Sequence, residues 1–136
     1  MPRLRLSAQL GSLESFRHFV LTEIRNWNIS QDLSDKAELI LEELLTNVFH
    51  YAYPSGNGDV EVECEQEASR FCIIIRDWGA AFNPLEKNDP ELSDDIAKRD
   101  VGGLGIYLVK KMVDEISYTR ENDMNTLTLY LRARDN

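Results

Sequence analysis

The sequence predicts an α+β fold: a two-layer α/β sandwich in which helices cover one face of a mixed, mainly antiparallel sheet. Two segments in the first half carry apolar residues at helical spacing. Strand-like segments follow in pairs, some alternating between apolar and polar residues and one almost continuously apolar. The 136 residues have the usual length of one domain, and neither a repeat nor a linker divides them. We therefore expect a single domain over residues 1–136.

The first strand is expected over residues 3–8, where charged and apolar side chains alternate. A helix is expected over residues 12–27, with the serine at its start as N-cap. The second helix has the strongest periodic signal in the chain; it is expected to begin at Ser30 or Ser34 and to end near Tyr51. Its apolar face predicts that this helix packs on the sheet.

Turn-forming residues fill the segment 53–59 and end the second helix. Two strands are expected after it. Alternation over residues 60–65 indicates a strand with one solvent-exposed face, and the nearly continuous apolar run over 71–76 indicates a strand closer to the centre of the sheet.

Residues 83–101 lack periodicity and are rich in Asp, Glu, Lys and Pro. A loop of this length inside a compact domain is usually functional or disordered. An amphipathic helix is expected over residues 104–115, and two strands, near 116–120 and 126–132, complete the fold.

Composition excludes several classes of function. The 24 acidic and 15 basic residues give a net charge of −9, which argues against a nucleic-acid partner because phosphates require a basic surface. Cys64 and Cys72 form no Cys-x-x-Cys pair, and we expect buried thiols in a reducing compartment. No apolar segment approaches the roughly 20 residues of a membrane-spanning helix, and the N-terminus does not resemble a signal peptide. We expect a cytoplasmic protein.

The first block with chemical potential is Glu43-x-x-x-Asn47 on the second helix. Residues four apart lie about 40° from each other around a helix, so both side chains lie at the border of its apolar face. The amide oxygen of Asn47 suits magnesium, with phosphates completing the coordination. Glu43, one turn earlier, can accept a proton from a hydroxyl group or water. Taken alone, the pair also fits an ordinary helix edge.

The second block, Asp77-Trp78-Gly79, directly follows the apolar strand. A carboxylate at this position can accept a hydrogen bond from the exocyclic amine of adenine, while the glycine lets the ring approach the backbone. The small and apolar residues that follow, up to Phe82, suit a flat ring. Taken alone, Asp and Gly are also common turn residues.

The third block, Gly102-Gly103-Leu104-Gly105, precedes the amphipathic helix. Glycines at a helix start let backbone N–H groups approach phosphate oxygens, which the helix dipole also favours. The block matches neither a P-loop nor the dinucleotide-binding fingerprint, and a plain glycine turn is the alternative.

Together, in this order, the three blocks predict an ATP–magnesium site with a metal ligand, a base-recognition residue and a phosphate-binding turn. Lys98 and Arg99, at the end of the long loop, can reach a phosphate and close the loop over it. As residues of a charged, solvated loop they need no function.

The blocks resemble those of the histidine-kinase-like (GHKL) ATPase superfamily over nearly the whole chain. Leu41–Asn47 resembles its N box, Asp77-Trp78-Gly79 its first glycine box, and the block 102–105 its second. Within the superfamily, the short chain and the residues of the three blocks resemble those of the bacterial anti-sigma-factor serine/threonine kinases. Sensor histidine kinases fit less well, because His18 lacks the acidic neighbour of a phospho-accepting histidine.

The resemblance implies a histidine-kinase-like ATPase fold with Glu43 as general base, Asn47 for magnesium, Asp77 for adenine and an ATP lid over about 86–101. Thr126 matches a threonine that helps to hold adenine, although Asn125 replaces the glycine that usually precedes it. The residues expected around the nucleotide, from the motifs and the resemblance together, are Asn47, Asp77, Gly79, Phe82, Lys98, Arg99, Gly102, Gly103, Leu104, Gly105 and Thr126.

The resemblance also implies partners. Such kinases phosphorylate a serine or threonine of a small antagonist protein, an anti-anti-sigma factor, and in their other state sequester a sigma factor, commonly as homodimers. The implied function is an ATP-dependent serine/threonine kinase with ATP and Mg2+, acting without direct contact to nucleic acid or membrane. One alternative is a partner-switching module that binds ATP without phosphotransfer. Another is a plain α+β interaction domain that binds no nucleotide.

Overall fold

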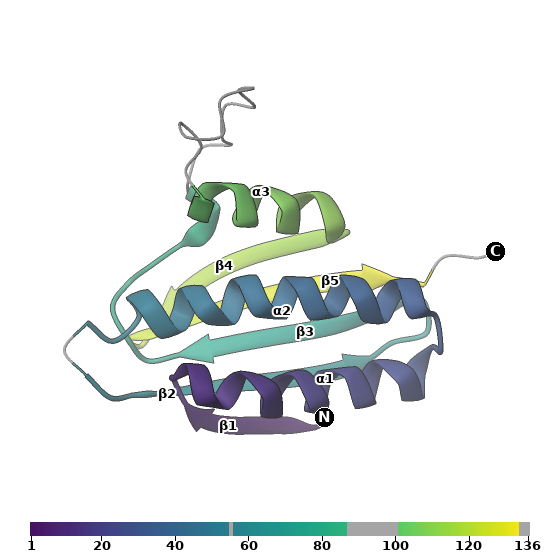
Figure 1. Cartoon of the computed structure of the whole chain (residues 1–136), viewed down its shortest axis with the longest axis horizontal. Helices are drawn as coiled ribbons and strands as arrows, with labels where there is room; N and C mark the ends of the chain where they lie inside the picture. The colour runs from purple at the N-terminus through teal and green to yellow at the C-terminus, as the bar shows by residue number, and fades with distance from the viewer. Residues whose placement is uncertain (55, 87–100, 134–136) are drawn as a thin grey trace.

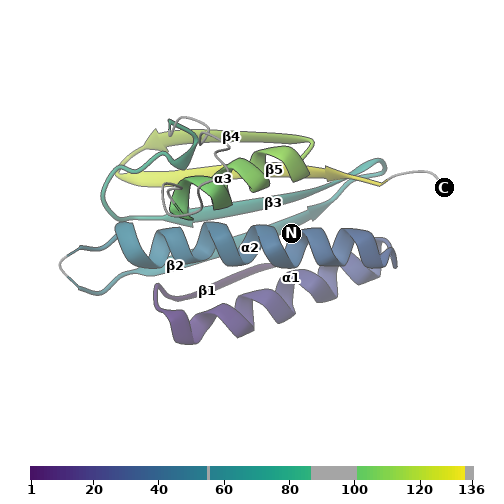
Figure 2. The same cartoon turned by 45° about the horizontal axis from the view of Figure 1, so that its top comes forward.

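The computed structural model describes residues 1–54, 56–86 and 101–133, and for residues 101–104 the backbone alone. Within these residues, three α-helices lie on one face of a five-stranded sheet, as Figure 1 shows. The helices are α1 (Leu13–Trp27), α2 (Gln31–Tyr51) and α3 (Val101–Met112). In both views α2 lies between the other two (Figures 1 and 2). The predicted α+β sandwich is thereby confirmed.

The sheet has the strand order β1-β2-β3-β5-β4, and all neighbouring strands among the described residues run antiparallel. The sequence predicted a mixed, mainly antiparallel sheet. The strands are β1 (Arg3–Ser7), β2 (Asp59–Gln66), β3 (Arg70–Asp77), β4 (Glu115–Glu121) and β5 (Met124–Arg132). β5 lies between β3 and β4, so the end of β3 lies beside the start of β5.

Local chemistry explains where the helices begin. The Ser30 hydroxyl accepts a hydrogen bond from the Leu33 backbone N–H, which selects Ser30 over Ser34 as the N-cap of α2. Ser12 precedes α1 as predicted, but its side chain makes no capping bond. A short 3-10 turn, Leu10–Ser12, leads into α1 instead.

The third helix differs from its predicted range of 104–115. α3 begins at Val101 and ends at Met112, so the glycine block lies in its first turns rather than before it. The end is set by Asp114, whose backbone N–H donates to the Tyr130 carbonyl at 3.0 Å. Its carboxylate accepts from the Arg132 N–H at 2.7 Å, and β4 starts one residue later.

The hydrophobic core fills the space between the helices and the sheet, with α2 at its centre. Each fully buried aliphatic or aromatic side chain contributes about 1.5–3 kcal/mol. The largest fully buried side chains are Phe16, Ile24, Ile40, Leu41, Leu44, Leu45, Phe71, Ile73, Ile75, Ile106, Leu129 and Leu131. In the described part of the chain, no helix is both long and apolar enough to cross a membrane.

The sheet face that points away from the helices carries a buried ion pair. The Arg76 guanidinium lies 2.7 Å from Glu63, whose side chain is 2% exposed, and 3.3 Å from Glu61. One Glu63 oxygen has no hydrogen-bond partner among the described residues. Glu63 therefore depends on Arg76 for its electrostatic compensation.

We expect Arg76→Met to lower the free energy of unfolding by about 1.5–3 kcal/mol, because it leaves a buried carboxylate uncompensated. Arg17→Met is the control: Arg17 also pairs with two glutamates, Glu14 and Glu38, but all three side chains are at least about a third exposed, so each pair is worth about 0–1 kcal/mol. Urea unfolding of both variants measures the difference. Equal losses would contradict a special role of the buried pair.

Candidate functional site

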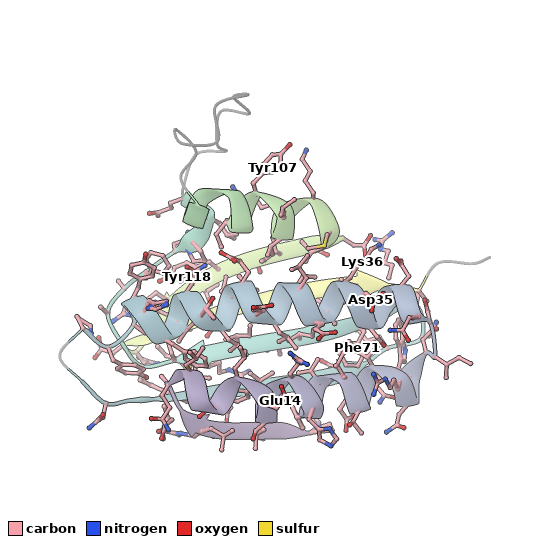
Figure 3. The ribbon with its side chains drawn as sticks, in the orientation of Figure 1. Glu14, Asp35, Lys36, Phe71, Tyr107 and Tyr118 are labelled. Carbon is pink, nitrogen blue, oxygen red and sulfur yellow. The ribbon has the colours of Figure 1, made fainter. Side chains whose placement is uncertain are left out.

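A pocket lies between α2 and the end of the sheet where β3 stops and β5 begins. Its lining residues are Leu44, Asn47, Val48, Ala52, Ile75, Asp77, Phe82, Pro84, Tyr118, Asn125 and Leu127. Figure 3 labels Tyr118 beside the C-terminal half of α2. The free volume is about 10 Å³, which is close to the requirement of one water molecule. A larger ligand therefore requires part of the lining to move.

Asp77, the last residue of β3, is buried at the edge of this pocket. Its Oδ1 accepts hydrogen bonds from the Gly79 backbone N–H at 3.0 Å and the Asn125 side-chain amide at 2.9 Å. No described residue donates to Oδ2. Burial raises the pKa of Asp77, while the hydrogen bonds from Asn125 and Gly79 and the charge of Arg120 act in the opposite direction. One carboxylate oxygen thus stays available to a donor on a ligand.

Asn125 connects Asp77 to a larger polar network. Its amide nitrogen also donates to the Ala80 carbonyl at 2.8 Å, and its amide oxygen accepts from the Tyr118 hydroxyl and, at 3.0 Å, from Arg120. Arg120 donates in addition to the Gly79 carbonyl at 2.9 Å. The network therefore holds the turn after β3 against the β4–β5 hairpin.

Asn47 projects from α2 into the same pocket and is 8% exposed. Its side-chain nitrogen is buried without a hydrogen-bond partner among the described residues. An unpaired buried donor costs about 1–3 kcal/mol, so its retention suggests an acceptor on a ligand. Within the described residues no group of three or more His, Cys, Asp or Glu side chains can hold a metal ion. A metal here needs oxygen ligands from a bound molecule as well as from Asn47.

Glu43 lies one turn before Asn47, on the side of α2 that faces α3. A β-carbon on Gly105 would lie only 2.0 Å from the carboxylate carbon of Glu43, so this glycine makes room for the acidic group. Glu43 is half-buried. The structure thus brings the first and third sequence blocks into contact.

The second block also needs its glycine. A β-carbon on Gly79 would meet the Ala52 carbonyl, which the next backbone N–H, of Ala80, contacts at 2.6 Å. Phe82 lines the pocket and stacks on Tyr51, with ring centroids 5.0 Å apart. Phe82 lies in the segment between β3 and the 3-10 turn Pro84–Glu86, which makes it a candidate for the part of the lining that moves.

One predicted site residue is on the wrong side of the sheet. Thr126 is opposite Arg76 in β3, and its neighbours Asn125 and Leu127 point into the pocket. Side chains alternate along a strand, so Thr126 faces away from the pocket, on the opposite side of the sheet from the place that the prediction of an adenine contact requires. Asn125 lies beside Asp77 instead.

The remaining predicted residues belong to or adjoin the long loop. Lys98, Arg99 and most of the expected lid 86–101 lie outside the described residues. Gly102, Gly103 and Leu104 have a described backbone, which is helical at the start of α3. Their roles toward a nucleotide stay predictions.

Sequence reasoning missed the network of Asn125, Tyr118 and Arg120. One signal was present: residues 125, 127, 129 and 131 occupy the buried face of β5, and all except Asn125 are leucines. A polar residue at an otherwise apolar, buried strand position needs hydrogen-bond partners. Which partners they are depends on the strand pairing.

Comparison with known proteins gives consistent relatives. The family model described as histidine kinase-like ATPase domain matches residues 6–131. The chain is similar to the serine/threonine-protein kinase BtrW of Bordetella bronchiseptica, at 28% identity over 92 residues, covering 67% of this chain and 65% of that protein. It is also similar to the serine-protein kinase RsbW of Staphylococcus aureus, at 26% identity over 113 residues, covering 74% of this chain and 67% of that protein. The matches thus span about two thirds of the length of these relatives.

Proposed function

Because the chain belongs to the histidine kinase-like ATPase family, we propose that it is an ATP-dependent protein serine/threonine kinase. Family membership implies ATP binding, and relatives named as serine or serine/threonine kinases support kinase activity. The observation that carries the proposal is a pocket lined by both Asp77 and Asn47. Among the described residues, no group donates to Asp77 Oδ2, and the buried amide nitrogen of Asn47 has no hydrogen-bond partner.

In this proposal, Asp77 recognises adenine. Its Oδ1 is occupied by two protein donors, so Oδ2 is left to accept the exocyclic amine of the base. Gly79 lets the backbone come close, and Phe82, with the apolar lining, contacts the ring. The small free volume is consistent with a pocket that opens when the base enters.

Asn47 suits a magnesium ion that also binds the phosphates. Its oxygen is a suitable ligand for this hard cation, and its unpaired nitrogen can donate to a phosphate oxygen. When bound, magnesium neutralises charge on the phosphate groups. The first turn of α3, which carries the glycine block, offers backbone N–H groups for the same phosphates.

Glu43 acts in the proposal as the general base. It accepts the proton of the substrate serine or threonine hydroxyl, whose oxygen forms a bond to the γ-phosphorus as the bond to ADP breaks. Its position against Gly105 keeps the carboxylate at the border of α2 and α3, one turn from Asn47. The base is therefore adjacent to the expected phosphate end of the site.

We extend the proposal to partners by resemblance to the anti-sigma-factor kinases. The substrate is then a small anti-anti-sigma antagonist, and the other partner is a sigma factor. A homodimer acting in the cytoplasm completes the proposal. The alternative is a partner-switching module in which ATP creates a docking surface without phosphoryl transfer.

Asn47→Leu tests the metal-binding part of the proposal. We expect the variant to lose at least about 10–100-fold in Mg–ATP affinity, because a metal ligand is removed while the branched shape of the side chain is kept, and even the loss of an outer-shell partner typically costs this much. Magnesium removal should weaken ATP binding to the wild-type protein and have much less effect on the variant. Calorimetric titration with and without magnesium measures both.

The stability of this variant provides an internal control. Leucine removes a buried unpaired donor, so the free energy of unfolding should not decrease. A destabilised variant with an unchanged magnesium dependence would contradict the assignment of Asn47 to the metal.

Transfer itself is tested with radiolabelled ATP and the small protein that co-purifies with the chain from its host. We expect label on a serine or threonine of that protein. If the chain binds ATP and its partner without any transfer, the kinase assignment fails and the docking module is left. If neither ATP nor ADP binds at millimolar concentration, the whole proposal fails.

A further inference from the structure

Asn125 is a polar residue in a buried, apolar strand face. It is 4% exposed, while Leu127, Leu129 and Leu131 occupy the equivalent positions along β5. Leucine at position 125 would fit the pattern of the strand and avoid the cost of burying an amide, which is substantial unless every polar atom is paired. The amide thus requires a specific explanation.

All the hydrogen-bonding capacity of the Asn125 amide is used inside the protein. The two N–H groups donate to Asp77 Oδ1 and to the Ala80 carbonyl, and the oxygen accepts from Tyr118 and Arg120. An asparagine side chain offers two donors and two acceptor positions, so none is left for a ligand. Asn125 therefore acts on a ligand only through the residues that it holds.

Its effect on Asp77 is directional. Asn125 and the Gly79 N–H both donate to Oδ1, so rotation of the carboxylate is disfavoured and Oδ2 stays the oxygen without a donor among the described residues. An ionised carboxylate can only accept hydrogen bonds, so it matches an amine on the ligand. A carbonyl oxygen at the same place on the ligand would face a negative charge.

We infer that Asn125 is a positioning residue that sets the nucleobase preference of the pocket for a 6-amino purine over a 6-oxo purine. The inference rests on the proposed nucleotide site and extends it. Adenine carries the amine, and hypoxanthine is nearly identical in shape with an oxygen in its place. ADP and IDP are therefore suitable probes.

The decisive measurement is the ratio of ADP to IDP affinity by calorimetry, for the wild-type protein and Asn125→Leu. We expect the wild-type protein to prefer ADP by about tenfold or more, as for a hydrogen bond to a charged group. Asn125→Leu should lose most of this preference, through weaker ADP binding with little change for IDP. A purely structural role of Asn125 would weaken both ligands equally and leave the ratio unchanged.

Asn125→Asp provides a second, pH-dependent test that keeps the shape of the side chain and its acceptors for Tyr118 and Arg120. While the two carboxyl groups share one proton, position 125 can still donate to Asp77. When both ionise, they repel and Asp77 turns. The ADP preference of this variant should thus be present at lower pH and disappear as the pH rises.

The wild-type protein should show the opposite trend. Burial raises the pKa of Asp77, and Asn125, Gly79 and Arg120 counteract it. Tyr53, which follows α2, is a further titratable group that interacts with Asp77 among the described residues, and its own pKa is raised, mainly by burial. Ionised Asp77 accepts the amine, so the wild-type preference is present above the Asp77 pKa and lost as the pH falls through it.

Thr126→Val is the matched control, because Thr126 is adjacent in β5 and faces away from the pocket. Its ADP to IDP ratio should equal that of the wild-type protein. The inference is overturned if Asn125→Leu has the same ADP to IDP affinity ratio as the wild-type protein. If that variant does not fold, the inference is overturned when the ADP preference of Asn125→Asp follows the same pH trend as that of the wild-type protein. Wild-type protein that binds neither nucleotide overturns the proposed function itself, and equal binding of ADP and IDP overturns the pairing of Asp77 with the amine.

Discussion

The Glu43→Gln variant is expected to bind ATP as tightly as the wild-type protein and to transfer phosphate about 10²–10⁴-fold more slowly. Glutamine keeps the shape of the side chain against Gly105 but cannot take up the hydroxyl proton. Glu43 does not line the pocket that we assign to adenine, so base recognition should be unaffected. Calorimetric titration and single-turnover transfer of radiolabelled phosphate measure the two properties separately.

Glu42→Gln is the matched control for this variant. Glu42 is the preceding residue of α2, carries the same charge and is exposed to solvent. The Glu42→Gln substitution changes the net charge by the same amount as Glu43→Gln, but it does not remove the proposed base from the site. Equal transfer rates in Glu43→Gln and the wild-type protein would remove Glu43 from the mechanism while leaving the kinase assignment intact.

The Asp77→Asn variant is expected to lose about 10–100-fold in ATP affinity, the range of a hydrogen bond to a charged group. The direction follows from the geometry. Two protein donors, on Gly79 and Asn125, point at the Oδ1 position, so the amide oxygen of the new asparagine must take that place. Its NH2 group then replaces Oδ2 and presents donors to the donor groups of the adenine amine.

The pH dependence separates this effect from misfolding. Binding through an ionised Asp77 is present above its raised pKa and is lost as the pH falls through that value, starting at a higher pH than for an ordinary aspartate. The Asp77→Asn variant should lack this component of the pH profile. Parallel profiles for the two proteins would contradict the role of Asp77 as the acceptor.

The stability of the wild-type fold should depend on pH in the opposite direction to its ATP binding. Because folding raises the pKa of Asp77, this group stabilises the fold below its ordinary pKa and loses that contribution as the pH rises through the raised value. An asparagine never ionises, so at neutral pH the variant should be at least as stable as the wild-type protein. Thermal unfolding at several pH values measures this.

The sequence predicted the elements well because their signals are local. The apolar periodicity of α2, the cap at Ser30 and the apolar run of β3 depend on residues close together in the chain. The main shift concerned α3, which is three residues earlier than predicted. Its end depends on contacts between Asp114 and the distant strand β5, which no local pattern contains.

The sequence by itself determined the fold class. It also supplied the candidate site residues Glu43, Asn47, Asp77 and the glycines, because these lie in motifs with recognisable order and spacing.

Only the tertiary structure decided whether Asn125 or Thr126 faces the pocket beside Asp77. Thr126 and Asn125 are adjacent, and the resemblance to the family motif predicted Thr126. A shift of one residue along a strand moves a side chain to the opposite face of the sheet, and pairing of Asp77 with Asn125 across β3 and β5 determines that face. The register is a property of two strands that are far apart in the chain, so the packed sheet alone brings the Asn125 amide onto the carboxylate of Asp77.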